Sequence, residues 1–229
     1  MNDGRPLDLV IFDVDGTLHD AASWWPDLIR RGVEEFAAAN DLRLAVPDDR
    51  AAMAVLGEKQ EGVWAPFLPN GEKHRWAELR SLVLPMEVEV LCSGGDLMFP
   101  GVRQLLEHLR VLGLKIALAS NCGYDYMEAM RHGQLLAELT DWQFCLATEG
   151  VTTKADMLRL ALQAARTQRA VMVGDRENDL AAAQEVGLPF YWRVNDLCSP
   201  APVAGRWHGA PEELLSLLGL PGISSGAGE

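Results

Sequence analysis

Cysteine is scarce in this chain, and its few copies are too scattered to form a framework. Cys92, Cys122, Cys145 and Cys198 are the only cysteines among 229 residues, and no two of them show C-x-x-C spacing. We therefore interpret them as reduced thiols, because a disulfide framework or a structural zinc site requires regularly spaced cysteines.

Long apolar runs are also missing. No run approaches the roughly 20 residues that a membrane-spanning helix needs, and the polar residues 1–6 lack the pattern of a signal peptide. We therefore predict a cytoplasmic protein that has no membrane partner. The hydrophobic content of 48% is ample for a packed core.

Positive charge is the third feature in short supply. The chain has 20 Lys and Arg against 33 Asp and Glu, for a net charge of −13, and it contains no basic run. This balance argues against nucleic acid as a partner, since binding a phosphate backbone requires a basic face. An anionic substrate would be repelled at long range, so its affinity would have to come from local groups.

The most informative feature present is an apolar run, residues 7–12, that leads into two acids and a glycine. Residues two apart on a strand project to the same side, so Asp13 and Asp15 can both face the place where Gly16 ends the extended path. Two facing carboxylates repel each other unless a cation compensates them, and Mg²⁺ prefers such oxygen ligands. The alternative is an ordinary buried strand that ends in an acidic turn.

Three further signals follow along the chain. Residues 115–119 form an apolar run that ends in Ser120 and Asn121, both able to donate hydrogen bonds to a phosphate oxygen. Lys154 opens an amphipathic helix, where its charge would add to the anion preference of a helix N-terminus. Residues 170–173 form another apolar run, which leads through Gly174 to Asp175, and Asp179 follows four positions on.

In this order the motifs resemble those of the haloacid dehalogenase-like hydrolase superfamily, in its phosphatase branch. They are Asp13-x-Asp15-Gly16-Thr17-Leu18, Ser120-Asn121, Lys154 and Gly174-Asp175-x-x-x-Asp179. The resemblance spans roughly residues 7–193. The dehalogenases that name the superfamily lack an acid at the position of Asp15, so the resemblance implies phosphoryl transfer. It also implies that the first strand lies at the centre of the sheet, between the strands that end at Ser120 and Asp175.

The hydrophobic pattern predicts an α/β fold. Buried strands are expected at residues 7–12, 115–119, 142–147, 170–173 and 188–192. Helices are expected at 102–112, 125–138, 154–166 and 179–186, with a short last helix near Pro211. This alternation is typical of a Rossmann-like, doubly wound parallel sheet, which binds ligands at the carboxyl ends of its strands.

Between the first two strands the pattern changes to helices alone, at residues 24–39, 48–56 and 72–84. We predict an inserted α-helical cap at 19–95, an α/β core at 1–18 and 96–221, and a disordered tail at 222–229. The resemblance implies that such a cap closes over the active edge of the sheet. His19, Asp20 and residues 92–96 would then be hinges.

The resemblance also implies roles for the site residues. Asp13 would attack phosphorus and form an aspartyl phosphate, and Asp15 would be the general acid and base. Mg²⁺ would be held by Asp13, by the backbone carbonyl of Asp15 and by Asp175. Asp179 would bind the ion through water or orient Asp175 and Lys154. The phosphate-binding residues would be Thr17, Ser120, Asn121 and Lys154.

The sequence therefore predicts a Mg²⁺-dependent phosphatase that acts on a small phosphate monoester. Two alternatives stay open: a phosphosugar mutase of the same superfamily, which shares every motif, and a non-catalytic phosphate-binding protein. The sequence makes no prediction of the physiological ester or of the oligomeric state.

Overall fold

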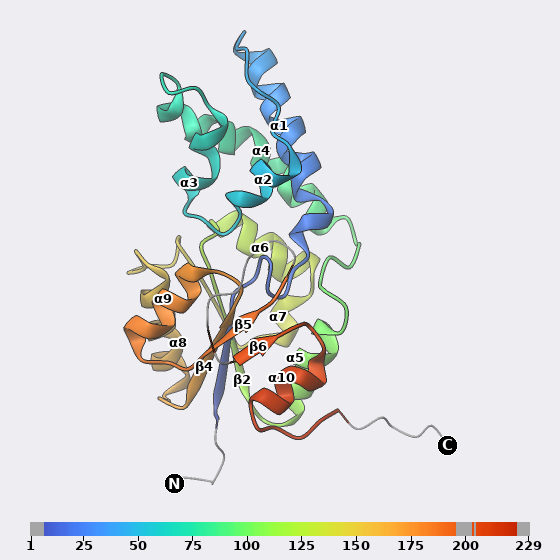
Figure 1. Cartoon of the computed structure of the whole chain (residues 1–229), viewed down its shortest axis with the longest axis vertical. Helices are drawn as coiled ribbons and strands as arrows, with labels where there is room; N and C mark the ends of the chain where they lie inside the picture. Colours follow the sequence, from blue (N-terminus) through green and yellow to red (C-terminus); the bar gives the residue numbers. More distant parts are fainter. Residues whose placement is uncertain (1–6, 196–202, 204, 224–229) are drawn as a thin grey trace, which may run out of the picture.

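A parallel β-sheet organises the structure, a computed structural model that describes residues 7–195, 203 and 205–223 (Figure 1). The strand order is β3-β2-β1-β4-β5-β6, and every neighbouring pair is parallel. The strands are β1 (Leu9–Phe12), β2 (Lys115–Ser120), β3 (Trp142–Cys145), β4 (Ala170–Gly174), β5 (Phe190–Arg193) and β6 (Gly205–Trp207). The first strand lies between β2 and β4, as the family resemblance implies.

Helices cover both faces of this sheet. Leu9 and Ile11 of β1 pack on one face against α8 and α9, whereas Val10 and Phe12 belong to the larger core on the other face. The core helices are α5 (Val102–Val111), α6 (Tyr124–Gly133), α7 (Leu136–Leu139), α8 (Lys154–Ala165), α9 (Glu177–Val186) and α10 (Pro211–Leu217). The predicted doubly wound α/β fold is therefore confirmed.

Four helices lie together beyond the end of β1 (Figure 1). They are α1 (Trp25–Ala39), α2 (Asp49–Ala54), α3 (Gln60–Trp64) and α4 (Trp76–Cys92). Ile29, Val33 and Phe36 of α1 recur at helical spacing and are buried. All four helices fall within residues 19–95, but the exact division of the chain into cap and core stays a prediction.

The helix predicted at 72–84 continues to Cys92, so the predicted end before Pro85 is wrong. A proline inside a helix removes one backbone hydrogen bond and normally favours termination. Here Pro85 is exposed, while Val83 before it and Met86 and Leu91 after it are buried. Burial of both halves of the helix outweighs the lost bond.

The helix predicted at 125–138 is instead two helices, α6 and α7. Leu135 breaks it with a left-handed backbone (φ +56°). The buried side chain of Gln134 donates to the carbonyls of Leu91 (3.0 Å) and Gly95 (3.1 Å) and accepts from the backbone of Leu97 (2.9 Å). These three hydrogen bonds hold the segment that leads from the helical insert back to the sheet. The short elements α3 and β6 were not predicted.

Some predictions fall on parts of the chain that the structure leaves out. Residues 224–229 of the predicted tail, and Cys198, lie outside the described residues. Within the described residues, Cys92, Cys122 and Cys145 are free thiols. Over the same part of the chain, no helix combines the length and the hydrophobicity that crossing a membrane requires.

Candidate active site

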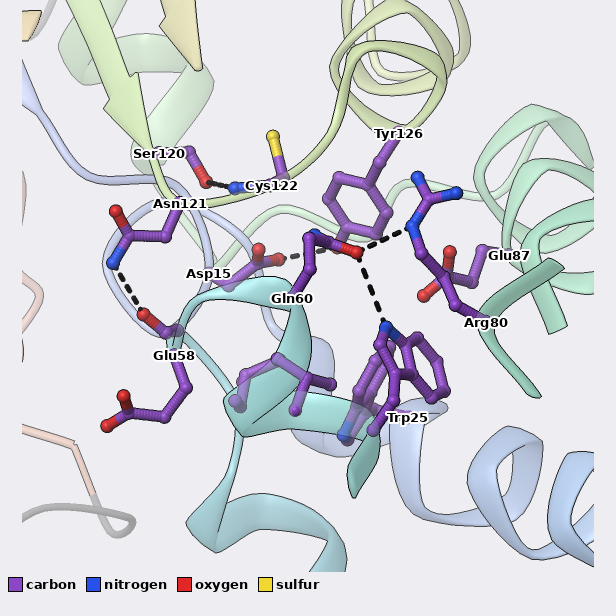
Figure 2. Close-up of a pocket in the computed structure, with 14 residues that line it drawn as sticks. Asp15, Trp25, Glu58, Gln60, Arg80, Glu87, Ser120, Asn121, Cys122 and Tyr126 are labelled. Carbon is purple, nitrogen blue, oxygen red and sulfur yellow. Dashed lines mark hydrogen bonds between the residues drawn. The ribbon is translucent and has the colours of Figure 1, made fainter. Parts of the chain in front are cut away.

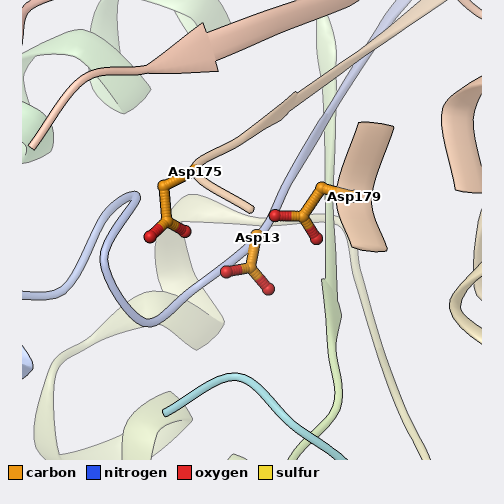
Figure 3. A group of neighbouring side chains, drawn as sticks. All are labelled: Asp13, Asp175 and Asp179. Atoms are coloured by element: carbon orange, nitrogen blue, oxygen red, sulfur yellow. The ribbon is translucent and has the colours of Figure 1, made fainter. Parts of the chain in front are cut away.

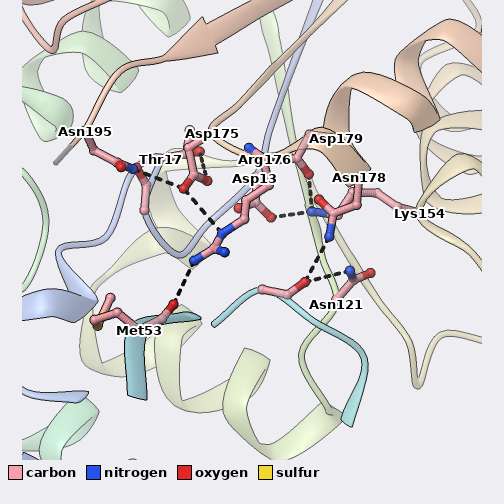
Figure 4. Close-up of polar contacts among 12 residues, drawn as sticks. Asp13, Thr17, Met53, Asn121, Lys154, Asp175, Arg176, Asn178, Asp179 and Asn195 are labelled. Carbon is pink, nitrogen blue, oxygen red and sulfur yellow. Dashed lines mark hydrogen bonds and ion pairs between the residues drawn. The ribbon is translucent and has the colours of Figure 1, made fainter. Parts of the chain in front are cut away.

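Three strand ends bring the motifs of the sequence to one edge of the sheet. Phe12 of β1 pairs with Leu118 of β2 and with Val173 of β4. The residues that follow these strands therefore arrive side by side, as expected for parallel strands. The first turn of α8 adds the buried Lys154 to the same place (Figure 4).

Three buried carboxylates form the centre of this edge (Figure 3). Asp13, Asp175 and Asp179 each offer an oxygen, and these oxygens all lie within 4.8 Å of one another. Lys154 Nζ donates to Asp13 Oδ1 at 2.6 Å and to Asp179 Oδ1 at 2.5 Å. Asp179 also accepts the backbone N–H of Arg176 through Oδ2 at 3.0 Å, which caps the start of α9.

Two glycines make this close approach possible. A Cβ atom at Gly16 would lie 2.3 Å from Asp175 Oδ2, and Gly16 also has a positive φ of +85°. A Cβ atom at Gly174 would lie 2.5 Å from Asp179 Oδ2. Both distances are far below van der Waals contact, so a larger residue at either position would displace a carboxylate.

Asp175 is held in place by several donors. Thr17 Oγ1 donates to Asp175 Oδ1 at 3.1 Å, Asn195 Nδ2 donates to Oδ2 at 3.0 Å, and Arg176 Nε lies 3.8 Å from Oδ2. Thr17 is fully buried, so its hydroxyl serves to orient this acid. The predicted contact of Thr17 with phosphate stays a prediction.

Burial and crowding oppose the charged forms of these acids. Burial raises the pKa of Asp13 well above its usual value, and Asp179 and Asp175 raise it further, although Lys154 acts against them. Burial and then Asp179 raise the pKa of Asp175 to about 6. Burial alone would lower the pKa of Lys154, but Asp13 and Asp179 raise it, so this lysine stays charged.

This donor set fits a hard divalent cation. It offers oxygen atoms only, and three clustered carboxylates exceed the one buried lysine that lies among them. Mg²⁺ prefers one or two carboxylates together with water and phosphate oxygens. Both oxygens of Asp175 and both oxygens of Asp179 already accept hydrogen bonds, so these contacts do not rank the two acids as ligands. The carboxylate of Asp15 does not belong to the group.

Asp15 instead faces a pocket between the sheet edge and the helical insert (Figure 2). Its Oδ1 accepts a hydrogen bond from Tyr126 Oη at 2.6 Å and lies 2.8 Å from His19 Nδ1. Ser120 and Asn121 line the same pocket from the end of β2. The two acids of the first motif therefore serve two adjoining spaces, the carboxylate group and the pocket.

The helical insert supplies the opposite wall of this pocket. Trp25, Arg80 and Glu87 line it there, and Arg80 Nε donates to Gln60 Oε1 at 2.6 Å. Burial raises the pKa of Glu87 to about 8, Arg80 lowers it and Asp15 raises it. The wall thus combines an aromatic face with polar and ionisable groups.

Backbone carbonyls of the insert accept hydrogen bonds from residues of the motifs. Gly57 O, in the loop between α2 and α3, accepts hydrogen bonds from Asn121 Nδ2 (2.9 Å) and Asn178 Nδ2 (3.1 Å) (Figure 4). Arg176 Nη2 donates to Met53 O at 3.0 Å. Residues after β2 and β4 therefore hold this loop over the site.

The structure brings together every site residue that the sequence predicts, in these two adjoining spaces. Sequence reasoning missed the contacts of Tyr126, Arg176 and Asn195, and it treated His19 only as a hinge. Asn195 follows the end of β5, so the rule that ligands bind at the carboxyl ends of strands could have identified it. No sequence signal pointed to Tyr126.

Comparison with known proteins places this geometry in a family. The model of the haloacid dehalogenase-like hydrolases matches residues 7–187. Phosphoglycolate phosphatase of Rhodobacter capsulatus is 28% identical over 236 residues, which cover 95% of this chain and 96% of that protein.

Solved structures show the same fold. A haloacid dehalogenase-like hydrolase of Streptococcus pneumoniae matches with a TM-score of 0.75 at 19% identity, over 93% of this chain and 98% of that one. CbbY of Rhodobacter sphaeroides, solved with xylulose-(1,5)-bisphosphate, matches with a TM-score of 0.66 at 21% identity, over 89% of this chain and 94% of that one.

Proposed function

Because the chain belongs to the haloacid dehalogenase-like hydrolase family, we propose that it is a Mg²⁺-dependent phosphatase that hydrolyses a small phosphate monoester through an aspartyl phosphate on Asp13. One observation carries the proposal. Asp13 is buried at the end of β1, where it accepts a hydrogen bond from Lys154. Two further carboxylates lie beside it, and the pocket that Asp15 faces is adjacent.

The reaction divides into two displacements. In the first, an oxygen of Asp13 forms a bond to phosphorus while the ester oxygen leaves and takes a proton from Asp15. In the second, water gives a proton to Asp15 and attacks phosphorus, which releases phosphate and restores Asp13. Asp15 lines the pocket where a leaving group would lie, which supports this assignment.

Charge compensation falls to Lys154, Ser120 and the cation. Lys154 is fully charged beside Asp13 and can offset charge on the phosphoryl oxygens, and the hydroxyl of Ser120 can donate to one of them. Mg²⁺, held by Asp13, Asp175 and the carbonyl of Asp15, would supply further positive charge when bound. Asp179 would orient Lys154 rather than bind the ion directly.

The pocket supports a small polar ester as substrate. Its wall carries Gln60, Arg80 and Glu87, which suit an organic group rich in oxygen. The names of the relatives agree with a small substrate. One is a phosphoglycolate phosphatase, and another was solved with xylulose-(1,5)-bisphosphate.

Phosphate release from a panel of esters tests the proposal. Purified protein with Mg²⁺ should hydrolyse p-nitrophenyl phosphate and at least one alkyl phosphate from a panel of phosphoglycolate and sugar phosphates. Asp13→Asn should lower turnover by at least about 10³-fold, because the nucleophile is lost. Asp125→Asn, an exposed acid at the start of α6, is the matched control and should keep full activity.

The same panel separates the alternatives. A folded, Mg²⁺-loaded protein that binds esters without any turnover would identify a phosphate-binding protein. Conversion of a hexose 1-phosphate into its 6-phosphate without net phosphate release would identify a mutase. Either result would overturn the phosphatase.

A further inference from the structure

His19 is fully buried at the crossing between the sheet and the helical insert. Its backbone forms isolated bridges with Asp15 on one side and with Met98 on the other. The chain passes this point twice, once on the way to α1 and once on the way back from α4. A polar imidazole without solvent contact needs hydrogen-bond partners here.

Those partners fix the tautomer of the ring. Trp24 Nε1 lies 3.2 Å from His19 Nε2, and an indole N–H can only donate, so Nε2 carries a lone pair. The ring is therefore neutral, with its proton on Nδ1. That Nδ1–H points at Asp15 Oδ1, 2.8 Å away, and donates to it.

Asp15 Oδ1 thus receives two hydrogen bonds, one from His19. The other comes from the hydroxyl of Tyr126 at 2.6 Å (Figure 2). No hydrogen bond from the described residues reaches Oδ2. An oxygen that accepts two hydrogen bonds uses both of its lone pairs and is a poor site for a proton of its own. A proton carried by the Asp15 carboxyl therefore resides on Oδ2, while Asp15 lines the pocket.

We propose that His19 is a positioning residue: through the chain Trp24, His19, Asp15 it holds the Asp15 carboxyl so that Oδ2 delivers its proton to the leaving oxygen. The inference rests on the proposed function, in which Asp15 is the general acid. Trp24 immediately precedes α1, the first helix of the insert. The same series of hydrogen bonds therefore couples the orientation of the Asp15 carboxyl to the position of that helix.

The dependence of rate on the leaving group distinguishes positioning from a purely structural role. An alkyl oxygen leaves poorly without a proton, whereas p-nitrophenolate leaves well without one. A misplaced acid should therefore slow alkyl phosphates much more than p-nitrophenyl phosphate. General loss of packing would slow both alike.

Four variants make the test. His19→Phe and Tyr126→Phe each remove one donor, and His19→Asn keeps an amide N–H near the position of Nδ1. His132→Asn, at an exposed histidine of α6, is the control. We expect His19→Phe to lower kcat for the best alkyl phosphate at least about 10-fold more than kcat for p-nitrophenyl phosphate, with KM nearly unchanged. His19→Asn should restore part of the difference.

Each outcome has one meaning. Equal losses on both substrates in His19→Phe and Tyr126→Phe, or no loss in either, would overturn the positioning role while leaving the phosphatase intact. If His19→Phe does not fold, His19→Asn and Tyr126→Phe carry the comparison. A wild type that hydrolyses no ester would overturn the proposed function and this role with it. Imidazole ¹⁵N spectra give a readout besides activity, since an Nε2–H tautomer or an imidazolium at neutral pH would also overturn the inference.

Discussion

Gly16 is the residue whose missing side chain matters most to the site. A Cβ atom there would lie 2.3 Å from Asp175 Oδ2, and the backbone φ is +85°. We expect Gly16→Ala to lower the free energy of unfolding by at least about 1 kcal/mol and to weaken Mg²⁺ binding, because Asp175 must move. Urea unfolding and a Mg²⁺ titration measure the two effects.

Gly94 provides a matched control for this substitution. Its φ is +86°, almost the same, but a Cβ atom added there would meet nothing within 4 Å. Gly94→Ala should therefore show the cost of the backbone conformation alone and leave Mg²⁺ binding unchanged. Equal Mg²⁺ affinity in both variants would contradict the argument that Gly16 makes room for Asp175.

Glu87 should make stability depend on pH. Burial raises the pKa of Glu87 to about 8 in the folded protein, from an ordinary 4.5. The unfolded chain releases this proton first as the pH rises, so the folded state loses stability between about pH 4.5 and pH 8. Glu87→Gln removes the charge. The free energy of unfolding of this variant should exceed that of the wild type by a few kcal/mol at pH 8.5, but not at pH 4.5.

Thermal or urea unfolding at the two pH values measures this difference. Glu89→Gln is the control, because Glu89 lies exposed on the same helix. It should follow the wild type at both pH values. A Glu87→Gln variant that is no more stable than the wild type at pH 8.5 would argue that the folded protein accommodates the charge of Glu87 after all.

At this scale the sequence could predict the residues that stand in motifs but not their partners. Asp13, Lys154 and Asp175 follow from motif order, since each stands directly after an apolar run or at a helix start. His19 and Tyr126 are 107 positions apart in the sequence, yet both donate a hydrogen bond to Asp15 Oδ1. Such pairing depends on how the insert and α6 pack, which no local pattern encodes.

Among the elements, the loop between α2 and α3 is bound directly by residues that follow strands of the sheet. Its Gly57 carbonyl accepts from two asparagines, one after β2 and one at the start of α9. Asn178→Ala removes one of these bonds, which is worth about 1 kcal/mol. We expect amide exchange in residues 55–59 to become about five-fold faster, because the loop opens more often. Hydrogen-exchange mass spectrometry measures it.

Lys59 offers the comparison for that experiment. Its Nζ donates to Thr152 O at 3.0 Å, but the side chain is exposed, so water competes for the bond. Lys59→Met should change exchange in residues 55–59 much less than Asn178→Ala. The opposite ranking would place the main attachment of the loop at Lys59.

The elements themselves were largely predictable, and the errors have physical causes. Strands buried on both faces read as apolar runs, so β1, β2 and β4 were found with errors of at most two residues. The continuation of α4 through Pro85 and the break at Leu135 depend on tertiary burial and on the contacts of Gln134. The strand β6 has three residues, too few to show a periodic pattern.

At the scale of the whole molecule, two positive side chains lie at the active edge of the sheet although the chain as a whole is acidic. The net charge is −13, yet Lys154 is buried beside the carboxylates and Arg176 lies 3.8 Å from Asp175. The remote acids of the protein repel a phosphate dianion, whereas Lys154, together with Mg²⁺ when it is bound, would attract the dianion at close range. Salt separates the two, because it screens distant charges more than close, buried ones.

We therefore expect kcat/KM for a phosphate ester to rise with ionic strength. Between about 10 mM and 150 mM salt the screening length falls from about 30 Å to about 8 Å, so repulsion by remote acids fades while the contacts of Lys154 persist. The rise in kcat/KM should be on the order of a few-fold and should come from a lower KM, with kcat unchanged. Initial rates at fixed free Mg²⁺ measure it, with sodium chloride and tetramethylammonium chloride compared to exclude binding of the sodium ion. A fall in kcat/KM in both salts would mean that the local positive charge dominates the approach of the substrate.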